Sequence, residues 1–113
     1  MATVTRIDTA ITSGGENPKD WTLLRNDGTW DITNDTVYMY ISKKRNTQYS
    51  IKLSSLPGAH QDNAHSKVRF RISIPAQTQT EIWWYEIWVL PDGETYARRQ
   101  VVGELMVYGT NKG

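Results

Sequence analysis

Hydrophobic and polar residues alternate along much of this chain, and turn residues interrupt the alternation about every 8 to 12 positions. The alternation is clearest at Thr36–Ser42, 67–74 and Glu81–Leu90. Shorter strands are expected at 3–9, 21–24, 30–33, 47–53, 95–102 and 104–108, and loops at 13–18 and 56–66. Seven to eight short strands joined by polar turns predict an all-β fold, either a two-sheet β-sandwich or a small barrel, and the size favours the sandwich.

The same alternation predicts which side chains form the core. We assign to it Val37, Met39, Ile41, Val68, Phe70, Ile72, Trp83, Tyr85, Ile87 and Val89. Each lies on the uncharged face of its strand, and successive strand residues point to opposite faces. Gly103 interrupts the last stretch of strand pattern, which predicts a bulge or a bend at that position.

The composition agrees with β structure in a single domain. The 113 residues include 5 Trp and 6 Tyr, which favour strands. We expect one domain over 1–113, with the core in 3–108 and a mobile tail in 109–113. A net charge of +1 argues against a nucleic-acid-binding protein and against a polybasic membrane protein. The chain has no Cys, which excludes disulfides and thiol catalysis.

The residues that alternate with the core residues along these strands predict an aromatic outer surface. If Tyr85 faces the core, Trp84 and Trp88 face outward, and Tyr38 and Tyr40 do the same from 36–42. Contiguous exposed aromatic surface usually marks an interaction site. Three interpretations are open: a protein–protein interface, a platform on which sugar rings stack, or a surface that a loop covers.

The candidates for chemistry are few. His60 and His65 flank Asp62 in the long loop, but their spacing matches no established metal motif. Glu86, which lies between two Trp, is the carboxylate with the most apolar surroundings. We therefore predict that the protein is not an enzyme and has no catalytic residue, no cofactor and no metal ligand.

The order of the strand and turn segments resembles a known phage domain. The segments are Trp21-Thr22-Leu23-Leu24, Asp27-Gly28, Trp30-Asp31-Ile32-Thr33, 36–44, Tyr85-Glu86-Ile87-Trp88-Val89, Asp92-Gly93 and Gly103-Glu104-Leu105-Met106-Val107. Over 3–108 they resemble the immunoglobulin-like N-terminal domain of phage baseplate upper proteins and similar small phage tail proteins. Two features depart from that family: the long fibre-forming segment that usually follows is not in this sequence, and 56–66 lacks the usual pattern.

The resemblance implies an immunoglobulin-like sandwich of antiparallel strands. It also implies a non-enzymatic structural protein of a virion, made in the host cytoplasm, that serves in a tail, a baseplate or a fibre attachment. Its partners would be other virion proteins in a homo- or hetero-oligomer, without nucleic acid or membrane. A capsid decoration protein is the variant within this class. The alternative from another class is a carbohydrate-binding module or adhesin, with a glycan on the Trp and Tyr face.

Overall fold

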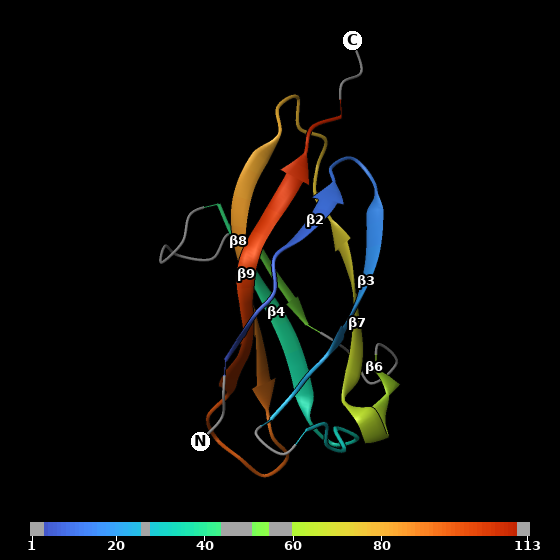
Figure 1. Ribbon diagram of the computed structural model, residues 1–113, viewed down its shortest axis with the longest axis vertical. Helices are drawn as coiled ribbons and strands as arrows, with labels where there is room; N and C mark the ends of the chain where they lie inside the picture. Colours follow the sequence, from blue (N-terminus) through green and yellow to red (C-terminus); the bar gives the residue numbers. More distant parts are fainter. Residues whose placement is uncertain (1–3, 26–27, 44–50, 55–59, 111–113) are drawn as a thin grey trace.

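The computed structural model folds the chain into two β-sheets packed face to face (Figure 1). It describes residues 4–25, 28–43, 51–54 and 60–110. The strands in these residues are β1 (Thr5–Arg6), β2 (Thr9–Thr12), β3 (Glu16–Thr22), β4 (Thr36–Ser42), β5 (Ile51–Ser54), β6 (His60–Asp62), β7 (Lys67–Ser73), β8 (Glu81–Leu90) and β9 (Arg98–Tyr108). The predicted all-β sandwich is confirmed. No helix within the described ranges is long and apolar enough to cross a membrane.

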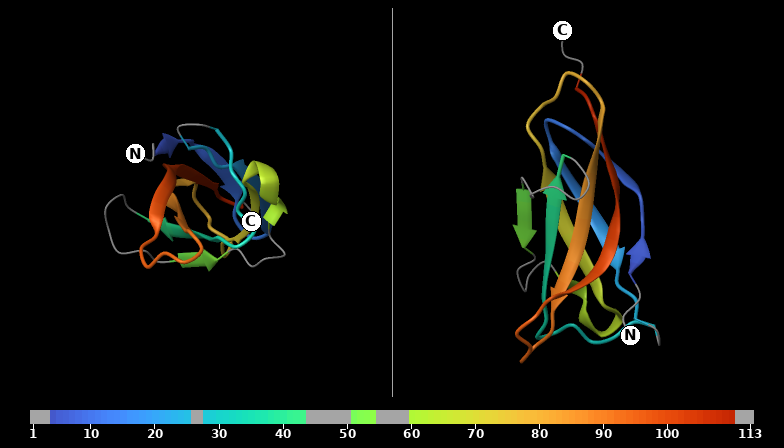
Figure 2. Two further views of the ribbon diagram at one scale, coloured as in Figure 1. Left: turned by 90° about the horizontal axis from the view of Figure 1, so that it is seen from below. Right: turned by 90° about the vertical axis from the view of Figure 1, so that its left-hand side faces the viewer.

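The two sheets differ in size. The larger one has the strand order β1-β9-β8-β4-β5, with β2 also paired to β9, and the smaller one has the order β3-β7-β6. Seen along the long axis of the molecule, the sheets form two layers (Figure 2). All pairs are antiparallel except that β1 and β2 run parallel to β9.

These parallel pairs correct one detail of the prediction. The described residues contain nine strands rather than seven or eight. The expected strand 3–9 is interrupted at Ile7 and Asp8, so that β1 and β2 form there, and β6 is an additional strand. The expected strands 95–102 and 104–108 are one strand, β9, which begins only at Arg98. β1 and β2 both follow the edge of the larger sheet in the direction of β9. After β2 the chain turns at 13–15 and begins β3 in the other sheet.

The predicted core is confirmed. All ten side chains assigned to it are buried: Val37, Met39, Ile41, Val68, Phe70, Ile72, Trp83, Tyr85, Ile87 and Val89. Within the smaller sheet, the ring of Trp21 lies 5.8 Å from that of Phe70, and across the sandwich it lies 5.7 Å from that of Tyr85. Burial of each large apolar side chain contributes about 1.5–3 kcal/mol, so these contacts hold the two layers together.

Two segments differ from the local sequence signals. β3 begins at Glu16 and contains Pro18, although the signals predict a loop over 13–18. β3 is an edge strand, and a proline there removes no hydrogen bond from the interior of a sheet. Residues 30–33, predicted as a strand, are irregular because the Asp31 carboxylate accepts a hydrogen bond from the backbone N–H of Thr33, 2.8 Å away.

The predicted loop 56–66 is only partly irregular, because it contains β6 and a 3₁₀ helix, Asn63–His65. The parts of 47–53 and 56–66 that fall in 47–50 and 56–59 lie outside the described residues. Of the expected mobile tail 109–113, residues 111–113 lie outside the described residues, and the first two form hydrogen bonds. Gly109 donates a hydrogen bond to Thr80, and Thr110 donates one to the carbonyl of Gln77.

Gly103 does not mark a bulge. β9 continues through it, and the register shift with β8 lies instead at Gln100, which is the extra residue between Arg99 and Val101. Gly103 is required for another reason. A Cβ at this position would lie 1.9 Å from the carbonyl oxygen of Ile7. The N-terminal segment, which runs along the edge of β9, therefore passes Gly103 so closely that only a hydrogen atom fits between them.

Tyr85 connects the N-terminal segment at Ile7 to the smaller sheet. Its hydroxyl donates a hydrogen bond to the Ile7 carbonyl and accepts one from the indole Nε1 of Trp21, 3.2 Å away. Burial raises the pKa of Tyr85 to about 12; the hydrogen bond from Trp21 lowers the pKa, and the charge of Asp8 raises it. One buried hydroxyl thus links β3, β8 and the segment between β1 and β2.

Gly103→Ala should destabilise the fold strongly. The added methyl must displace the Ile7 carbonyl, and we expect a loss of at least about 3 kcal/mol in the free energy of unfolding. Urea titration followed by tryptophan fluorescence measures it. Gly15→Ala is the matched control, since a Cβ there has no atom within 4 Å, and it should change stability by less than about 1 kcal/mol. Equal losses in the two variants would contradict the close approach.

The Tyr85 hydroxyl should make stability fall in strong alkali. The unfolded chain releases this proton near pH 10, whereas the folded protein keeps it to about pH 12. Deprotonation therefore favours the unfolded state across that window, by about 2 kcal/mol in total. Denaturant titrations from pH 9 to 12 should show this extra loss in the wild type but not in Tyr85→Phe. Parallel curves for the two proteins would contradict the assignment.

Candidate functional site

The outer face of the larger sheet, on the side away from the core, carries the predicted aromatic residues. In the register of β4 with β8, Tyr38 lies opposite Trp88 and Tyr40 lies opposite Glu86. The pairing of β8 with β9 is regular from Glu81 to Ile87, so no bulge shifts the parity of β8. The predicted grouping of these side chains on one face is therefore correct.

Trp84 lies on this face but is not open to solvent. Its side chain is only 5% exposed, and the guanidinium of Arg6 lies 5.7 Å from the centroid of its ring. The expectation of an exposed ring is wrong for Trp84. The sequence pattern does not show this, because Arg6 comes from β1, which reaches the same face from the far end of the chain.

Glu86 organises the centre of the outer face. One carboxylate oxygen accepts a hydrogen bond from the indole Nε1 of Trp88, at 3.1 Å. The other accepts from the indole Nε1 of Trp84, at 3.1 Å, and from a guanidinium nitrogen of Arg99, at 3.3 Å. Glu86 is buried, so these donors stabilise a charge that would otherwise be costly there. The carboxylate holds both indole rings in fixed orientations.

At one end of the outer face the rings surround a hollow of about 400 Å³, which we call the aromatic hollow. It is lined by Tyr38, Tyr40, Trp88, Tyr96 and Ala97. The rings of Tyr38 and Tyr40 meet edge to face, with centroids 5.2 Å apart. Burial raises the pKa of Tyr38, and the adjacent Tyr40 raises it further. The Tyr38 phenol therefore presents a neutral ring at neutral pH.

Tyr96 was not found by the parity argument. It lies in the connection between β8 and β9, outside any strand, and its side chain is 81% exposed. The predicted strand 95–102 includes Tyr96, but β9 begins only at Arg98, so the alternation of a strand does not place Tyr96. An aromatic residue two positions after the Gly93-Glu94 turn is the only sequence signal, and it identifies no partner.

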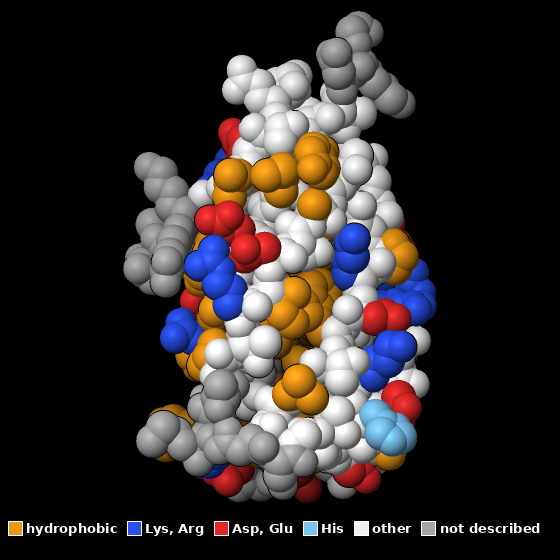
Figure 3. Space-filling view, in the orientation of Figure 1, with side chains coloured by type: hydrophobic (Ala, Val, Ile, Leu, Met, Phe, Trp, Pro, Cys, Tyr) orange, Lys and Arg blue, Asp and Glu red, His pale blue; other side chains and the backbone are white. Residues whose placement is uncertain are grey.

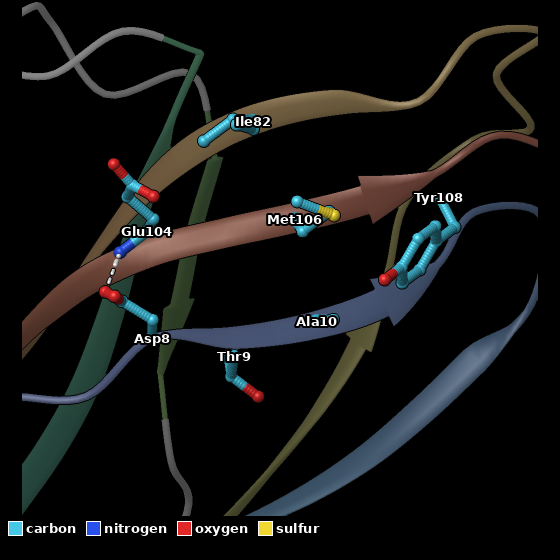
Figure 4. A pocket seen from close by; sticks show the side chains of 7 residues that line it. All are labelled: Asp8, Thr9, Ala10, Ile82, Glu104, Met106 and Tyr108. Atoms are coloured by element: carbon cyan, nitrogen blue, oxygen red, sulfur yellow. Dashed lines mark hydrogen bonds between the residues drawn. The ribbon is translucent and has the colours of Figure 1, made fainter.

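At the other end of the face is a second hollow of about 300 Å³, which we call the apolar hollow. It is lined by Asp8, Thr9, Ala10, Ile82, Glu104, Met106 and Tyr108 (Figure 4). Hydrophobic side chains gather in this part of the surface, and charged ones lie directly below them (Figure 3). Ile82 shares the parity of Trp84, so the same pattern could have identified it.

The outer face of the smaller sheet has a different character. Asp20 forms two hydrogen bonds with Arg69, at 2.7 and 3.2 Å, and Glu16 forms one with Arg71, at 2.7 Å. The hydrogen bond from Arg69 is the main reason that the pKa of Asp20 is lowered. One side of the sandwich is thus covered by ion pairs, whereas the other carries aromatic and apolar side chains.

The two histidines make separate local contacts. His60 lies 2.9 Å from the amide oxygen of Asn63, and His65 lies 2.9 Å from a carboxylate oxygen of Asp62. Across the residues that the structure describes, no group of three or more His, Asp or Glu is arranged to hold a metal ion.

Comparison with known proteins gives no relative. No protein-family model, no curated protein and no solved structure matches this chain. The function is therefore argued from the surface itself.

Glu86→Gln should destabilise the protein although it conserves shape. The amide loses one acceptor, directs N–H groups toward the indole donors, and leaves Arg99 without its carboxylate. We expect a loss of about 2–4 kcal/mol in the free energy of unfolding, measured by urea titration. Glu104→Gln is the control, because that side chain is half-exposed and should cost less than about 1 kcal/mol. Equal effects would mean that Glu86 does not hold the rings.

Proposed function

We propose that this protein is a non-enzymatic structural protein of a phage virion, in a tail, a baseplate or a fibre attachment, and that it docks to other proteins through the outer face of the larger sheet. The observation that carries the docking role is the pair of hollows on one outer face of the sandwich. Aromatic and apolar side chains line both hollows on the larger sheet, beside the ion pairs of Arg6 and Arg99, whereas the ion pairs of Arg69 and Arg71 lie on the outer face of the smaller sheet. The virion assignment rests on the resemblance of the strand and turn motifs over 3–108. A capsid decoration protein would use the same face.

The exposure of large apolar and aromatic side chains on this face supports docking. Ile82, Tyr96 and Tyr108 are large side chains that remain about half or more exposed. Each forgoes part of the roughly 1.5–3 kcal/mol that full burial would contribute. Trp and Tyr are enriched where protein interfaces concentrate their binding energy. A partner that covered Trp88 and Tyr96 would recover this stabilisation.

The hydrogen bonds of Glu86 favour a structural role over a catalytic one. Its carboxylate oxygens accept from two indoles and from Arg99. A general acid or base must exchange a proton with a substrate within hydrogen-bond reach, whereas these donors are part of the fold. The residue most suggestive of chemistry on this face thus serves to orient the rings.

The geometry gives less support to the carbohydrate alternative. A platform for sugars uses exposed rings that lie parallel and are spaced for successive units. Here Trp84 is buried, and the rings of Tyr38 and Tyr40 are inclined at 86°. A single half-buried Trp88 beside crossed tyrosines is better suited to interdigitate with protein side chains.

The proposal predicts that the protein is incorporated into purified virions through the aromatic hollow. The variants Tyr96→Ser and Trp88→Ser/Tyr96→Ser would be introduced into the phage that carries the gene, and copies per particle counted by quantitative mass spectrometry. We expect both variants to fall at least about tenfold below wild type, because each removes an anchor ring. Melting curves of the purified variants verify that they are folded.

Leu24→Ser is the matched control. Leu24 is also an exposed large apolar residue, but it lies in neither hollow, so its copy number should equal that of wild type. If purified virions of the wild-type phage do not contain the protein, the structural role is refuted. Normal incorporation of both aromatic variants would refute docking through this hollow, and binding of glycans lost in the same variants would favour the carbohydrate alternative.

A further inference from the structure

We infer that the outer face of the larger sheet binds a second copy of this chain, face to face, about a two-fold axis that places the aromatic hollow of each copy on the apolar hollow of the other. This inference rests on the proposed function, since it identifies the partner of the same face. It follows from three observations: the position of the two hollows, their charges and the size of the face.

The two hollows lie on one face of a continuous sheet. Ile82, in the apolar hollow, and Trp88, in the aromatic hollow, both point outward from β8. Six residues of a strand separate them by roughly 20 Å. A two-fold axis that lies in the plane of the interface, perpendicular to the line that joins the two hollows and above the midpoint between Trp84 and Glu86, turns the second copy onto the first and exchanges the two ends. Both contacts then form at once, as the self-complementary interface of a symmetric dimer requires.

The exposed charges of the two ends are opposite. Beside the apolar hollow, a single guanidinium, that of Arg6, faces the half-exposed carboxylates of Asp8 and Glu104. The backbone N–H of Glu104 donates to Asp8 and is the main reason that the pKa of Asp8 is lowered, so this carboxylate stays charged (Figure 4).

Beside the aromatic hollow, Arg99 lies opposite Trp88 on the outer face, whereas Arg98 lies opposite the buried Val89 and points to the other side of the sheet. The Arg99 side chain is 44% exposed, and the carboxylate that it contacts, Glu86, is buried, so the charge that faces solvent there is positive. Asp92 and Glu94 lie further out, in the turn between β8 and β9. The two-fold arrangement brings Arg99 toward the carboxylates of the apolar hollow in the other copy.

The apolar surfaces also match in kind. The apolar hollow has Met106 between Ile82 and Ala10 in the register of the sheet. Methionine adapts its shape and makes favourable contacts with aromatic rings, which the other end supplies as Trp88 and Tyr96. A second copy therefore fits both ends, whereas a small ligand would occupy only one.

The face is large enough for a dimer. β8 has ten residues, or a length of about 33 Å, and four neighbouring strands span about 19 Å. The product, roughly 600 Å² on each copy, approaches the ~800 Å² per partner of a standard protein interface.

Sedimentation velocity of the purified chain tests the inference. At about 100 µM, above the micromolar dissociation constants of weaker interfaces of this size, we expect the wild type to be a dimer. Glu104→Lys makes both ends of a copy basic, and Ala97→Glu, which changes a residue that lines the aromatic hollow, makes the aromatic end acidic. Each variant alone should bind itself at least about tenfold more weakly than wild type does.

Mixing the two variants gives the decisive measurement. A mixed dimer has one unchanged contact and one contact in which the charges are exchanged, so an equimolar mixture should regain dimer. Glu16→Lys is the matched control: Glu16 also forms a surface ion pair with an arginine, Arg71, but on the other sheet, and it should leave the dimer intact.

A wild type that stays monomeric at this concentration would overturn the inference. So would two single variants that remain dimers, or a mixture that stays monomeric. Virion incorporation is measured separately, so a monomer that is still incorporated refutes the second copy and leaves the proposed function standing. If the protein is a dimer in solution but is absent from virions, the proposed function is refuted and the binding of a second copy stands.

Discussion

The arrangement of this protein depends on one buried hydroxyl. Tyr85 donates its hydrogen bond to the carbonyl of Ile7 and accepts one from the indole of Trp21, so the larger sheet, the smaller sheet and the N-terminal segment meet at a single atom. The carbonyl reaches Tyr85 only because Gly103 has no side chain. A buried polar group must find partners, and here the partners come from three distant parts of the sequence.

This constraint determines which side chains reach the outer face of the larger sheet. Because Ile7 packs against Gly103, β1 and β2 both lie along the edge of β9 and bring Arg6 and Asp8 to that face. Arg6 then covers Trp84 and faces Asp8 and Glu104. The N-terminal strands thus add charged side chains to an otherwise aromatic and apolar face. The composition of this face depends on the same close approach at Gly103 that lets Tyr85 reach Ile7.

Glu86 has the corresponding role within the surface. A buried carboxylate is costly unless donors surround it, and the two indoles and Arg99 supply them. In return the rings of Trp84 and Trp88 lose their freedom before any partner arrives. Preorganised rings lose less conformational entropy on binding, which is how a small surface can bind with useful affinity. The outer face of the smaller sheet differs, because its charged side chains form ion pairs that solvent reaches, such as Asp20 with Arg69.

The sequence alone determined the β class, the buried face of each long strand and the grouping of Tyr38, Tyr40 and Trp88, because alternation with period two is a local property of a strand. It did not determine the burial of Trp84, the parallel pairing of β1 and β2, or the place of Tyr96 beside Trp88. Each of these depends on a contact between residues far apart in the chain or on a loop that has no period. Only the tertiary structure decided these three features, through the close packing of Ile7 against Gly103 and the path of the β8–β9 connection.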